Sequence, residues 1–461
     1  MTAHTPFSVR GKRVTVVGAG RSGVAAAELL VRRGALVTLS DKRNRIEDAD
    51  RLRSAGVELE LGGHQHTTFT AADLLVLSPG VPGNLPEIEA ARRARVPVVG
   101  ELELASRWLR GRIVAITGTK GKSTTTTLTG RMLEAGGHRV LVGGNIGHAL
   151  SAQVDDSTDD TIHVVETSSF QLESIEMFHP WIAVLLNFSA DHLDRHASVE
   201  EYARAKARIF RNQQSDDWAV LNADDPSVAT LAAGARARRL PFSMQTPLSD
   251  GVLVSGDAIV RRTAAGEDRL VPLTAIRLLG PHLVADVVAA SAVAWVAGVN
   301  PTAMTRAVEG FTGLEHALEP VADVAGVRFV NDSKATNIEA ARRAVESFGD
   351  GVVVILGGRF KGGDFRDLID ALQARRAAVV AIGESRPLIR EAFDGVLPVH
   401  EADDMRGAVR KGFAAAGAGR TVVLAPACAS FDMFHDYAER GRVFKQEVLR
   451  LQRDWSGGRE H

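Results

Sequence analysis

The chain has 461 residues, 45% of them apolar, and its 55 lysine and arginine residues nearly balance 56 aspartate and glutamate residues, for a net charge of −1. This balance excludes proteins that bind nucleic acids or anionic membranes through their overall charge. The N-terminal MTAHTPFSVRGKR has no apolar segment, and the longest apolar stretch, 287–299, is shorter than a membrane span. We therefore expect a cytoplasmic protein without a membrane or nucleic-acid partner.

Runs of Val, Ile and Leu alternate with helical stretches rich in Ala, Arg and Glu along the whole chain. Such alternation is typical of α/β folds with parallel sheets. Glycine-rich strand ends divide the chain into three domains, in keeping with about 150 residues per domain. We predict a Rossmann-like domain over residues 1–101, a central P-loop ATPase-like domain with a parallel sheet over residues 102–313, and a second Rossmann-like domain over residues 314–461.

The first predicted strand, 13–17, leads into the glycine loop GAGRSG at 18–23, and a later strand ends at Asp41. G-x-G-x-x-G with an acidic residue downstream is typical of NAD-binding folds and would indicate an oxidoreductase. The same loop fits any diphosphate that lies on a helix N-terminus. Asp41 then either accepts a hydrogen bond from a ribose or base, or is a solvated turn residue. The pattern leaves these alternatives open.

A second glycine loop, AITGTKGKST at 115–124, follows the apolar strand 112–116. Its small residues let backbone N–H groups converge on phosphate oxygens, Lys122 adds a positive charge, and the Ser123 hydroxyl can ligate Mg²⁺ at a helix N-terminus. The loop is shorter than the G-x-x-x-x-G-K-[ST] pattern, whose first glycine would fall at Ile116. We predict a nucleoside triphosphate site here, and an ordinary strand-to-helix turn is the alternative.

Two further strand ends of the central domain carry candidate metal ligands. Glu166 follows the strand 162–165, and His192 lies in the loop 191–196 after the strand 183–187. Ligands of α/β sheets collect at these carboxyl ends, and Mg²⁺ favours oxygen ligands. The alternatives are a helix-capping carboxylate for Glu166 and a solvated histidine for His192.

The sequence SVEE at 198–201 is a capping box and predicts a helix from about Val199 to Phe210. Within it Lys206 lies four residues after Tyr202 and four before Phe210, so it shares an apolar stripe with two aromatic side chains. A lysine in such a place usually extends its amine to water. If it faces Mg²⁺ instead, a neutral or carbamylated amine is favoured, because an ammonium group would repel the metal.

In the third domain, strands are predicted to end near Asn331, Gly357, Gly383 and Ala425. The single cysteine, Cys428, excludes an internal disulfide and a cysteine-rich zinc site. Because it follows the last of these apolar runs, we expect a buried structural thiol rather than a nucleophile.

These motifs resemble those of the Mur ligase family over nearly the whole chain. The loop at 117–124 is similar in all members and in folylpolyglutamate synthetases, whereas the stretches 166–172, 331–337 and 424–432 resemble the member that adds D-glutamate. The resemblance implies an ATP- and Mg²⁺-dependent ligase that joins D-glutamate to UDP-N-acetylmuramoyl-L-alanine through an acyl phosphate, in the synthesis of peptidoglycan precursors. We expect a monomer.

The resemblance also implies a role for each matching residue. The catalytic residues would be Lys122, Glu166, His192 and Lys206, and the metal ligands Ser123, Glu166, His192 and carbamylated Lys206. ATP would be bound by Gly118, Thr119, Lys120, Gly121, Lys122, Ser123, Thr124, Asp332 and Lys334. The UDP substrate would be bound by Arg21, Ser22, Asp41, Lys42, Ser78, Pro79, Gly80 and Asn145. D-Glutamate would be bound by Thr336, Lys361, Ser430, Phe431 and Tyr437.

Three positions depart from the family pattern. Leu283 and Asp286 stand where the family has two asparagines near the nucleotide, and Ala317 stands where it has an arginine. An ionised aspartate accepts a hydrogen bond but cannot donate one, so we expect weaker contacts to adenosine. Two alternatives stay open, namely a Mur-type ligase for another amino acid and a non-catalytic nucleotide-binding paralogue.

Overall fold

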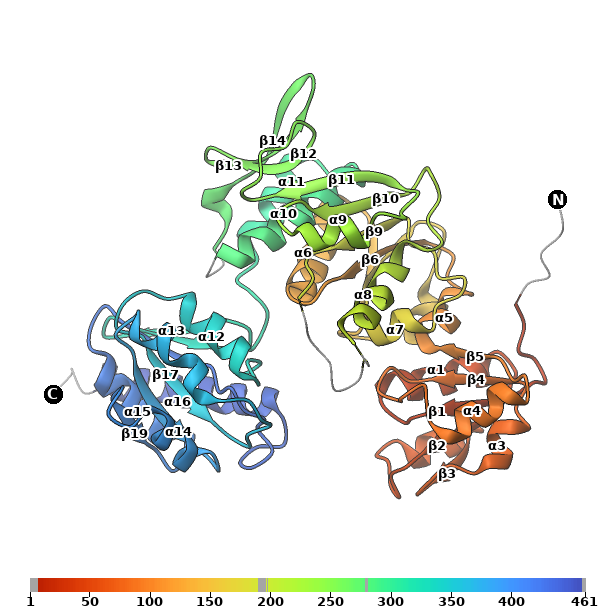
Figure 1. The fold of residues 1–461 in the computed structure, drawn as a ribbon, viewed down its shortest axis with the longest axis horizontal. Helices are drawn as coiled ribbons and strands as arrows, with labels where there is room; N and C mark the ends of the chain where they lie inside the picture. Colours follow the sequence, from red (N-terminus) through yellow and green to blue (C-terminus); the bar gives the residue numbers. More distant parts are fainter. Residues whose placement is uncertain (1–6, 190–195, 197, 278–280, 458–461) are drawn as a thin grey trace. The chain divides into compact units, whose positions relative to one another are not determined.

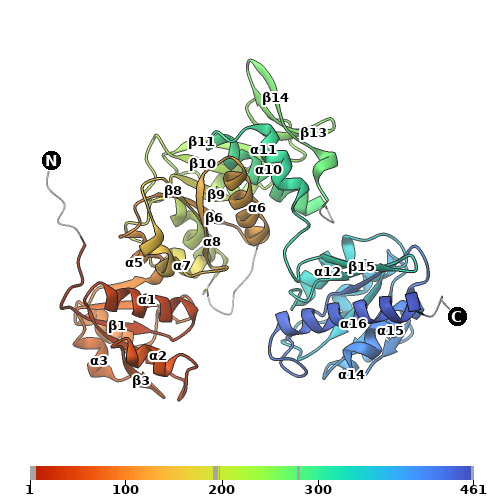
Figure 2. The same ribbon diagram turned by 180° about the vertical axis from the view of Figure 1, so that it is seen from behind.

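The computed structural model of this chain describes residues 7–189, 196, 198–277 and 281–457. The chain divides into two compact units, one of Met1–Ile276 with Val284–Gly310 and one of Arg277–Leu283 with Phe311–His461. Figures 1 and 2 show them from opposite sides. Both contain parallel-rich sheets covered by helices, which confirms the predicted α/β fold class. The predicted domain boundaries, after residues 101 and 313, stay predictions.

The first sheet of the larger unit has the strand order β3-β2-β1-β4-β5, and all neighbouring strands are parallel. The strand order reverses at β1, so the loops after β1 and β4 lie next to each other at the carboxyl edge, where such sheets bind ligands. The elements are β1 (Arg13–Val17), α1 (Arg21–Arg32), β2 (Leu36–Asp41), α2 (Ala49–Ser54), β3 (Glu58–Leu61), α3 (His66–Thr70), β4 (Leu74–Leu77), α4 (Pro86–Arg93) and β5 (Val98–Gly100).

Helices cover both faces of this sheet (Figure 1). On β4, Leu74 and Val76 pack in one core with residues of α1 and α2, whereas Leu75 and Leu77 pack in another with α3 and α4. All four side chains are buried. Burial on both faces explains why parallel strands such as β4 have continuous apolar sequences.

The central sheet of the same unit has the strand order β14-β13-β12-β11-β10-β9-β6-β8-β7. Its parallel part contains β9, β6 and β8 side by side, so the three loops predicted to form the phosphate and metal site leave neighbouring strands. The elements are α5 (Glu101–Ser106), β6 (Arg112–Thr117), α6 (Lys122–Ala135), β7 (Arg139–Gly144), η1 (Leu150–Asp156), β8 (Thr161–Glu166), α7 (Ser169–Glu173), β9 (Ile182–Leu185), α8 (Val199–Ala207), η2 (Arg208–Phe210), β10 (Trp218–Asn222), α9 (Pro226–Leu231), β11 (Arg238–Ser243), β12 (Gly251–Ser255), β13 (Ala258–Thr263), β14 (Gly266–Pro272), η3 (Leu273–Ala275), α10 (Pro281–Val296) and α11 (Pro301–Glu309).

An antiparallel extension of β12, β13 and β14 lies at one edge of this otherwise parallel sheet. The short turn Gly256–Asp257 joins β12 to β13, and Gly256 adopts a φ of 59°. A tight turn with positive φ suits adjacent antiparallel strands, whereas parallel neighbours need a long crossover.

The smaller unit contains a sheet with the strand order β15-β16-β20-β17-β18-β19, in which β15 alone is antiparallel to its neighbour. α12, α13 and α14 pack on one face, and α15 and α16 on the other. β16, β17, β18 and β20 end within one residue of the predicted strand ends. The elements are β15 (Glu319–Val324), β16 (Val327–Asn331), α12 (Ile338–Glu346), β17 (Val353–Gly357), η4 (Phe365–Leu368), α13 (Ile369–Gln373), β18 (Ala378–Ile382), α14 (Arg386–Phe393), β19 (Val399–Glu401), α15 (Met405–Ala416), β20 (Thr421–Leu424) and α16 (Tyr437–Gly457).

Two expectations from composition can be checked in this fold. Across the described residues, no helix combines the length and apolar character needed to cross a membrane. Cys428 is buried, and burial raises the pKa of its thiol to about 11. The predicted burial of the thiol is confirmed, and a thiol with a raised pKa is a poor nucleophile at neutral pH.

Candidate functional site

The first candidate site lies at the carboxyl edge of the N-terminal sheet, where the loops after β1 and β4 are joined by a hydrogen bond. The Ser78 hydroxyl donates to the Gly18 carbonyl over 2.8 Å. A Cβ at Gly23 would lie 1.8 Å from the same carbonyl oxygen, so a side chain there would displace the loop. The Ala19 amide donates to Asp41 Oδ2 over 2.6 Å. The glycine loop is thus fixed from β2 and from β4.

A cavity of about 470 Å³ opens at this edge. Every residue predicted to bind the UDP substrate lines it except Lys42, which is exposed and outside the lining. Arg43, which the sequence analysis missed, lines the cavity in its place. The lining residues are Gly18, Gly20, Arg21, Ser22, Asp41, Arg43, Ser78, Pro79, Gly80, Val81, Gly144, Asn145, Gly147, Ala149 and Gln171.

Asp41 orients Arg43 in this cavity. The Nε and Nη2 groups of Arg43 donate to the Asp41 carboxylate over 2.9 and 3.0 Å. Burial alone would raise the pKa of Asp41, but hydrogen bonds from Arg43 and the Ala19 amide outweigh it and lower the pKa to about 2. Asp41 is therefore ionised at neutral pH. The Arg43 side chain, which is 57% exposed, carries a positive charge that an anionic ligand can reach.

The second candidate site is the loop between β6 and α6. Its glycines have positive φ values, 157° at Gly118 and 82° at Gly121, which other residues rarely adopt. Lys122 Nζ donates to the carbonyls of Gly118 and Thr119, each over 3.0 Å. The strand, the glycine turn and a helix that begins at Lys122 therefore occur in the predicted order.

Asn187 holds this loop from the end of β9, a role that was not predicted from the sequence. Its Oδ1 accepts hydrogen bonds from the amides of Thr119 and Lys120 over 3.1 and 2.9 Å. Its Nδ2 donates to the Lys120 carbonyl over 3.1 Å. The only signal in the sequence was its place directly after an apolar strand, at the edge where the phosphate loop also ends.

Glu166 connects the phosphate-loop edge to the first cavity. It is buried at the end of β8, next to β6. The Nδ2 group of Asn145, a lining residue of the cavity, donates to Glu166 Oε1 over 2.7 Å. Glu166 Oε2 is buried and has no hydrogen-bond partner among the described residues. A buried carboxylate oxygen without a partner is costly, and a hard cation such as Mg²⁺ would satisfy it.

Lys206 reaches the phosphate loop from α8. It is buried with Tyr202 and Phe210, as the apolar stripe predicts, and does not extend to water. Its Nζ donates to the Gly118 carbonyl over 2.8 Å and lies 4.7 Å from the centre of the Tyr202 ring. Lys122 Nζ binds the same carbonyl. Two amines at one carbonyl oxygen make a concentrated positive charge where phosphate binding is predicted.

His192 lies outside the described residues, so its role as a metal ligand stays a prediction. His196 is described and buried, with Nε2 2.9 Å from Ser169 Oγ. Within the described ranges, no group of three His, Cys, Asp or Glu side chains could hold a metal ion. Among the described residues, a metal at Glu166 would therefore need hydroxyl or carbamate oxygens as further ligands. The predicted ones are the hydroxyl of Ser123 and the carbamate of Lys206.

The third candidate site lies in the smaller unit, at the shared edge of β16, β20 and β17. The Ser333 hydroxyl donates to the Tyr437 carbonyl over 2.8 Å, and the Ala427 amide donates to the Ala335 carbonyl over 2.9 Å. These bonds join the loops after β16 and β20 to the start of α16. The residues predicted to bind ATP or D-glutamate in these segments and after β17 are Asp332, Lys334, Thr336, Lys361, Ser430, Phe431 and Tyr437.

These side chains differ in exposure and charge. Lys361, Phe431 and Tyr437 are exposed, whereas Ser430 is buried. Burial raises the pKa of Asp332 to about 7, although the Leu318 amide donates to its carboxylate. Asp332 therefore changes charge near neutral pH.

Arg440 holds the two loops together and was missed in the sequence analysis. Its buried guanidinium donates to the hydroxyl and carbonyl of Ser333, each over 2.9 Å, and to the Cys428 carbonyl over 3.1 Å. Burial lowers the pKa of Arg440 to about 10, so it stays charged at neutral pH. The sequence did indicate burial of Arg440, because this residue precedes Phe444 and Val448 at four-residue spacing on one helix face, and both are buried.

The structure places the three departures from the family pattern in different surroundings. Leu283 packs against the apolar core of the smaller unit. Ala317 is half-buried beside His316, whose Nδ1 lies 2.9 Å from Asn331 Nδ2. Asp286 is buried against the phosphate loop, since a Cβ at Gly121 would lie 2.3 Å from its Oδ1.

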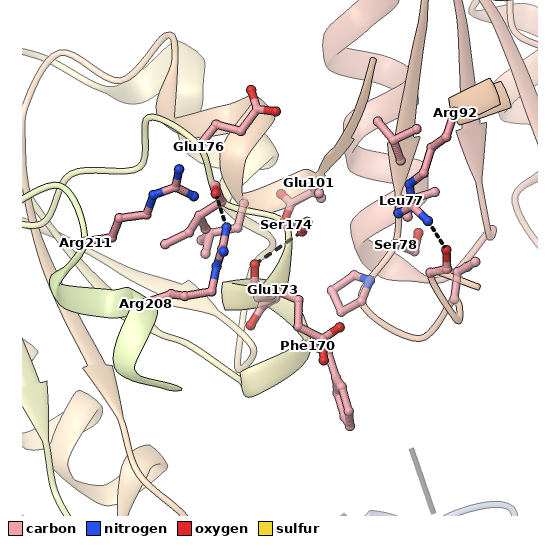
Figure 3. Close-up of a pocket in the computed structure, with 18 residues that line it drawn as sticks. Leu77, Ser78, Arg92, Glu101, Phe170, Glu173, Ser174, Glu176, Arg208 and Arg211 are labelled. Carbon is pink, nitrogen blue, oxygen red and sulfur yellow. Dashed lines mark hydrogen bonds between the residues drawn. The ribbon is translucent and has the colours of Figure 1, made fainter. Parts of the chain in front are cut away.

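A second cavity, of about 300 Å³, shares part of its lining with the first. Figure 3 shows Arg208 and Arg211 on one side of it and Arg92 on the other. Arg208 donates to the carbonyls of Leu172 and Ile175, and Arg92 to a loop carbonyl. Three glutamates also line this cavity. Three arginines are therefore matched by three carboxyl groups in the same lining.

Family profiles match three parts of the chain. The Mur ligase MurD-like N-terminal domain matches residues 12–100, the Mur ligase middle domain residues 116–294, and the Mur ligase glutamate ligase domain residues 318–428. Among solved structures, the alanine ligase MurC from Thermotoga maritima has a TM-score of 0.61 at 18% identity and covers 95% of this chain and 99% of its own. A pseudomurein peptide ligase type C from Methanothermus fervidus has a TM-score of 0.58 at 17% identity, with 96% and 100% covered. At these identities the likeness concerns the fold.

Curated relatives are much more similar in sequence. A UDP-N-acetylmuramoylalanine–D-glutamate ligase from Acidobacterium capsulatum is 47% identical over 448 residues, which are 96% of this chain and 97% of the relative. A protein of the same name from Koribacter versatilis is 45% identical and covers 96% and 99%. The chain therefore belongs to the Mur ligase family, in the group of UDP-N-acetylmuramoylalanine–D-glutamate ligases.

Proposed function

We propose that this protein joins D-glutamate to UDP-N-acetylmuramoyl-L-alanine with cleavage of ATP, forming UDP-N-acetylmuramoyl-L-alanyl-D-glutamate, ADP and phosphate. The observation that carries the proposal is the hydrogen bond from Asn145 to Glu166, which connects the first cavity to the edge of the phosphate loop. A ligase needs this connection, because it must bring the carboxylate of a bound substrate to a phosphoryl group. The reaction of an NAD-linked oxidoreductase does not require a phosphate loop next to the first cavity.

The substrate's UDP group occupies the first cavity in this proposal. Its diphosphate lies on the N-terminus of α1, where backbone amides and the cations Arg21 and Arg43 balance its charge. The muramoyl end reaches Asn145. The substrate carboxylate then points to the phosphate loop.

Activation of the substrate carboxylate follows at the phosphate loop. The carboxylate attacks the γ-phosphorus of ATP, and Lys122 reduces the repulsion between the two anions, giving an acyl phosphate and ADP. Ser123, Glu166, His192 and carbamylated Lys206 would hold Mg²⁺, which neutralises phosphate charge when bound. Oε2 of Glu166, which is buried and has no hydrogen-bond partner among the described residues, fits this group.

Amide formation uses the third candidate site. Lys361 and Ser430 bind the carboxylates of D-glutamate, with Thr336, Phe431 and Tyr437 around it. Its free amine attacks the acyl carbon, and phosphate leaves from the tetrahedral intermediate. Asp332 and Lys334 contact the nucleotide.

Phosphate release from ATP tests the proposed function. The wild type is incubated with UDP-N-acetylmuramoyl-L-alanine and one of D-glutamate, L-alanine, diaminopimelate, L-lysine or D-alanyl-D-alanine. The expected result is phosphate release with D-glutamate and with none of the other amino acids. Release with another amino acid would contradict D-glutamate as the amino-acid substrate, and no release with any of them would contradict the proposed function.

Arg43→Ala is expected to weaken binding of the UDP substrate by about 10- to 100-fold, because a charge-assisted hydrogen bond contributes about 1.5 to 3 kcal/mol. It also leaves Asp41 ionised in a cavity that receives a diphosphate. Lys42→Ala is the matched control, because the neighbouring lysine is exposed and outside the lining. Isothermal titration measures the affinity of each variant for the UDP substrate. Equal affinities in the two variants would contradict the role of Arg43.

Arg440→Met is expected to destabilise the smaller unit by about 1 to 3 kcal/mol, because buried carbonyl and hydroxyl groups of Ser333 and Cys428 lose their donor. The Michaelis constants for D-glutamate and ATP should rise, while that for the UDP substrate stays unchanged. Thermal unfolding and steady-state kinetics measure these effects, with the exposed Arg442→Met as control. Lower stability with all three Michaelis constants unchanged would show that Arg440 does not position the loops.

A further inference from the structure

The second cavity, of about 300 Å³, has walls from two parts of the larger unit. One wall contains the ends of β4 and β5, and the other contains α7, η2 and the residues that follow them. The walls meet where a Cβ at Gly100 would lie 2.2 Å from the Ser174 hydroxyl oxygen. The volume is at the lower end of the range of about 300 to 1,000 Å³ for small-molecule sites. The cavity therefore suits a ligand smaller than a nucleotide.

Four of the six charged side chains that line this cavity already have partners. Arg92 and Arg208 each donate to backbone carbonyls. Glu176 forms an ion pair over 2.8 Å with Arg107, which lies outside the lining. Glu173 Oε1 lies 3.1 Å from Nδ1 of a buried histidine. These four groups are satisfied without a ligand.

The other two charged side chains are Glu101 and Arg211. Glu101 is 1% exposed, and its Oε1 accepts the Ser151 amide over 2.6 Å. Its Oε2 is buried and has no hydrogen-bond partner among the described residues. A buried polar atom without a partner is costly. The deeper part of the cavity therefore lacks a donor to this carboxyl group.

Arg211 is exposed, and within the described part of the chain its side chain forms no hydrogen bond or ion pair. Figure 3 shows it beside Arg208 on one wall, with Glu101 drawn between these arginines and Arg92. Burial and then the nearby charge of Arg211 lower the pKa of Arg208. An anion at this end of the cavity would relieve the repulsion between the two cations.

Most of the remaining lining is apolar and includes Leu77, Val81, Val98, Leu102 and Ile175. A ligand that fits the whole cavity thus carries a cationic donor for Glu101, an anion for Arg211 and an apolar group between the walls. A simple amine would leave Arg211 without an anion, and a simple carboxylate would leave Glu101 without a donor. An α-amino acid with an apolar side chain supplies all three groups.

We propose that the second cavity binds a free α-amino acid with an apolar side chain, and that this ligand strengthens binding in the first cavity. Its ammonium group donates to Glu101 Oε2 and its carboxylate pairs with Arg211. Ser78, Pro79, Val81 and Gln171 line both cavities, so a ligand that fixes the walls of the second also fixes part of the first. Two ligands that favour the same arrangement bind cooperatively.

Leucine is the probe for the first part of the proposal. Ligand-observed NMR measures binding of L-leucine and D-leucine to the wild type, and a dissociation constant of about 1 mM is expected for a ligand of this size. 3-Methylbutylamine and 4-methylpentanoate, which each lack one of the two charges, should bind at least about tenfold more weakly. No binding of either enantiomer up to about 20 mM would overturn the proposal. Equal binding of the singly charged analogues would overturn the assignment to Glu101 and Arg211.

Two variants place the ligand in the cavity. Glu101→Gln retains an oxygen for the Ser151 amide but puts an N–H donor where Oε2 lies, so leucine binding should fall by about tenfold or more. Arg211→Ala should have a similar effect without loss of stability, because no described residue depends on its guanidinium. Arg204→Ala, which removes an exposed arginine outside the lining, is the matched control. Unchanged leucine binding in Arg211→Ala would overturn the proposed site even if Glu101→Gln failed to fold.

Isothermal titration of the UDP substrate with and without saturating leucine tests the second part. The dissociation constant of the substrate should fall by about fivefold or more, and Arg211→Ala should abolish this change. An unchanged constant would overturn the cooperativity. A constant that keeps rising as leucine is added would show that the two ligands compete for one space, which would overturn a separate site.

Failure of this inference and failure of the proposed function give different results. Leucine binding requires neither nucleotide nor UDP substrate, and only the cooperativity rests on the proposed function. A wild type that releases phosphate with D-glutamate but binds no leucine contradicts the second site alone. A wild type that binds leucine but no UDP substrate contradicts the proposed function and the cooperativity, and leaves the leucine site supported.

Discussion

Lys122→Ala is expected to reduce ligation by about 10²- to 10³-fold or more while leaving the affinity for UDP-N-acetylmuramoyl-L-alanine nearly unchanged. The reason is that Lys122 is proposed to supply charge where the phosphoryl group is transferred, whereas the cavity proposed for the UDP group has a lining that does not include Lys122. Glu166→Ala should reduce the rate to a similar extent, because Oε2 is the candidate metal ligand. It should also cost about 1 kcal/mol of substrate binding, since Asn145 loses its acceptor.

Isothermal titration of both variants with the UDP substrate, beside phosphate release under saturating substrate, measures these effects separately. Lys42→Ala serves again as a control for loss of a lysine outside the cavity lining. If Lys122→Ala lost substrate affinity to the same extent as rate, the phosphate loop and the first cavity would not have separate roles.

Lys206→Ala is expected to be nearly inactive, with a rate lower by about 10²-fold or more, and to be partly rescued by acetate or formate. The amine of Lys206 is buried and shares the Gly118 carbonyl with Lys122. An uncharged amine at this place can add carbon dioxide, and the resulting carbamate would place a negative charge beside Lys122 and the metal. Small carboxylates replace the lost oxygens in the alanine variant.

The measurement is phosphate release at increasing carboxylate concentration. Lys206→Arg is the matched control, because it retains a cation but cannot form a carbamate, and it should be inactive without rescue. Full activity of Lys206→Ala in bicarbonate-free buffer would contradict a carbamate that holds the metal.

Local patterns predicted the parts of the site that depend on neighbouring residues in the sequence. The phosphate loop was visible because an apolar strand, two glycines and a helix follow one another within a few residues. The helix that carries Lys206 was visible from its capping box, and Ser198 Oγ does accept the Glu201 amide over 3.2 Å. After Ala207 this helix tightens into a 3-10 turn, which the pattern could not show.

The distinction between Lys42 and Arg43 could not be predicted in this way. Both are cations directly after β2, and either could have faced the cavity. Arg43 does so because Asp41 is held by the Ala19 amide and in turn binds the guanidinium. This arrangement requires the β1 loop and the end of β2 to be adjacent, which is a property of the sheet.

The surroundings of Asn187 and Asp286 also could not be predicted from the neighbouring sequence. Asn187 lies far along the chain from Thr119 and Lys120, so its clamp on the phosphate loop exists only once β6 and β9 are paired. Burial raises the pKa of Asp286 above its ordinary value, and the residue type alone does not show that burial.

The hydrogen bond between Asn145 and Glu166 has a thermodynamic consequence. Asn145 lines the cavity proposed for the UDP substrate, and Glu166 is the candidate metal ligand. A ligand that moves either side chain therefore alters the binding free energy of the other ligand. Such coupling is reciprocal: if bound metal changes the affinity for the UDP substrate by some factor, the substrate must change the affinity for the metal by the same factor. The two occupants of the larger unit are therefore expected to bind cooperatively, whichever arrives first.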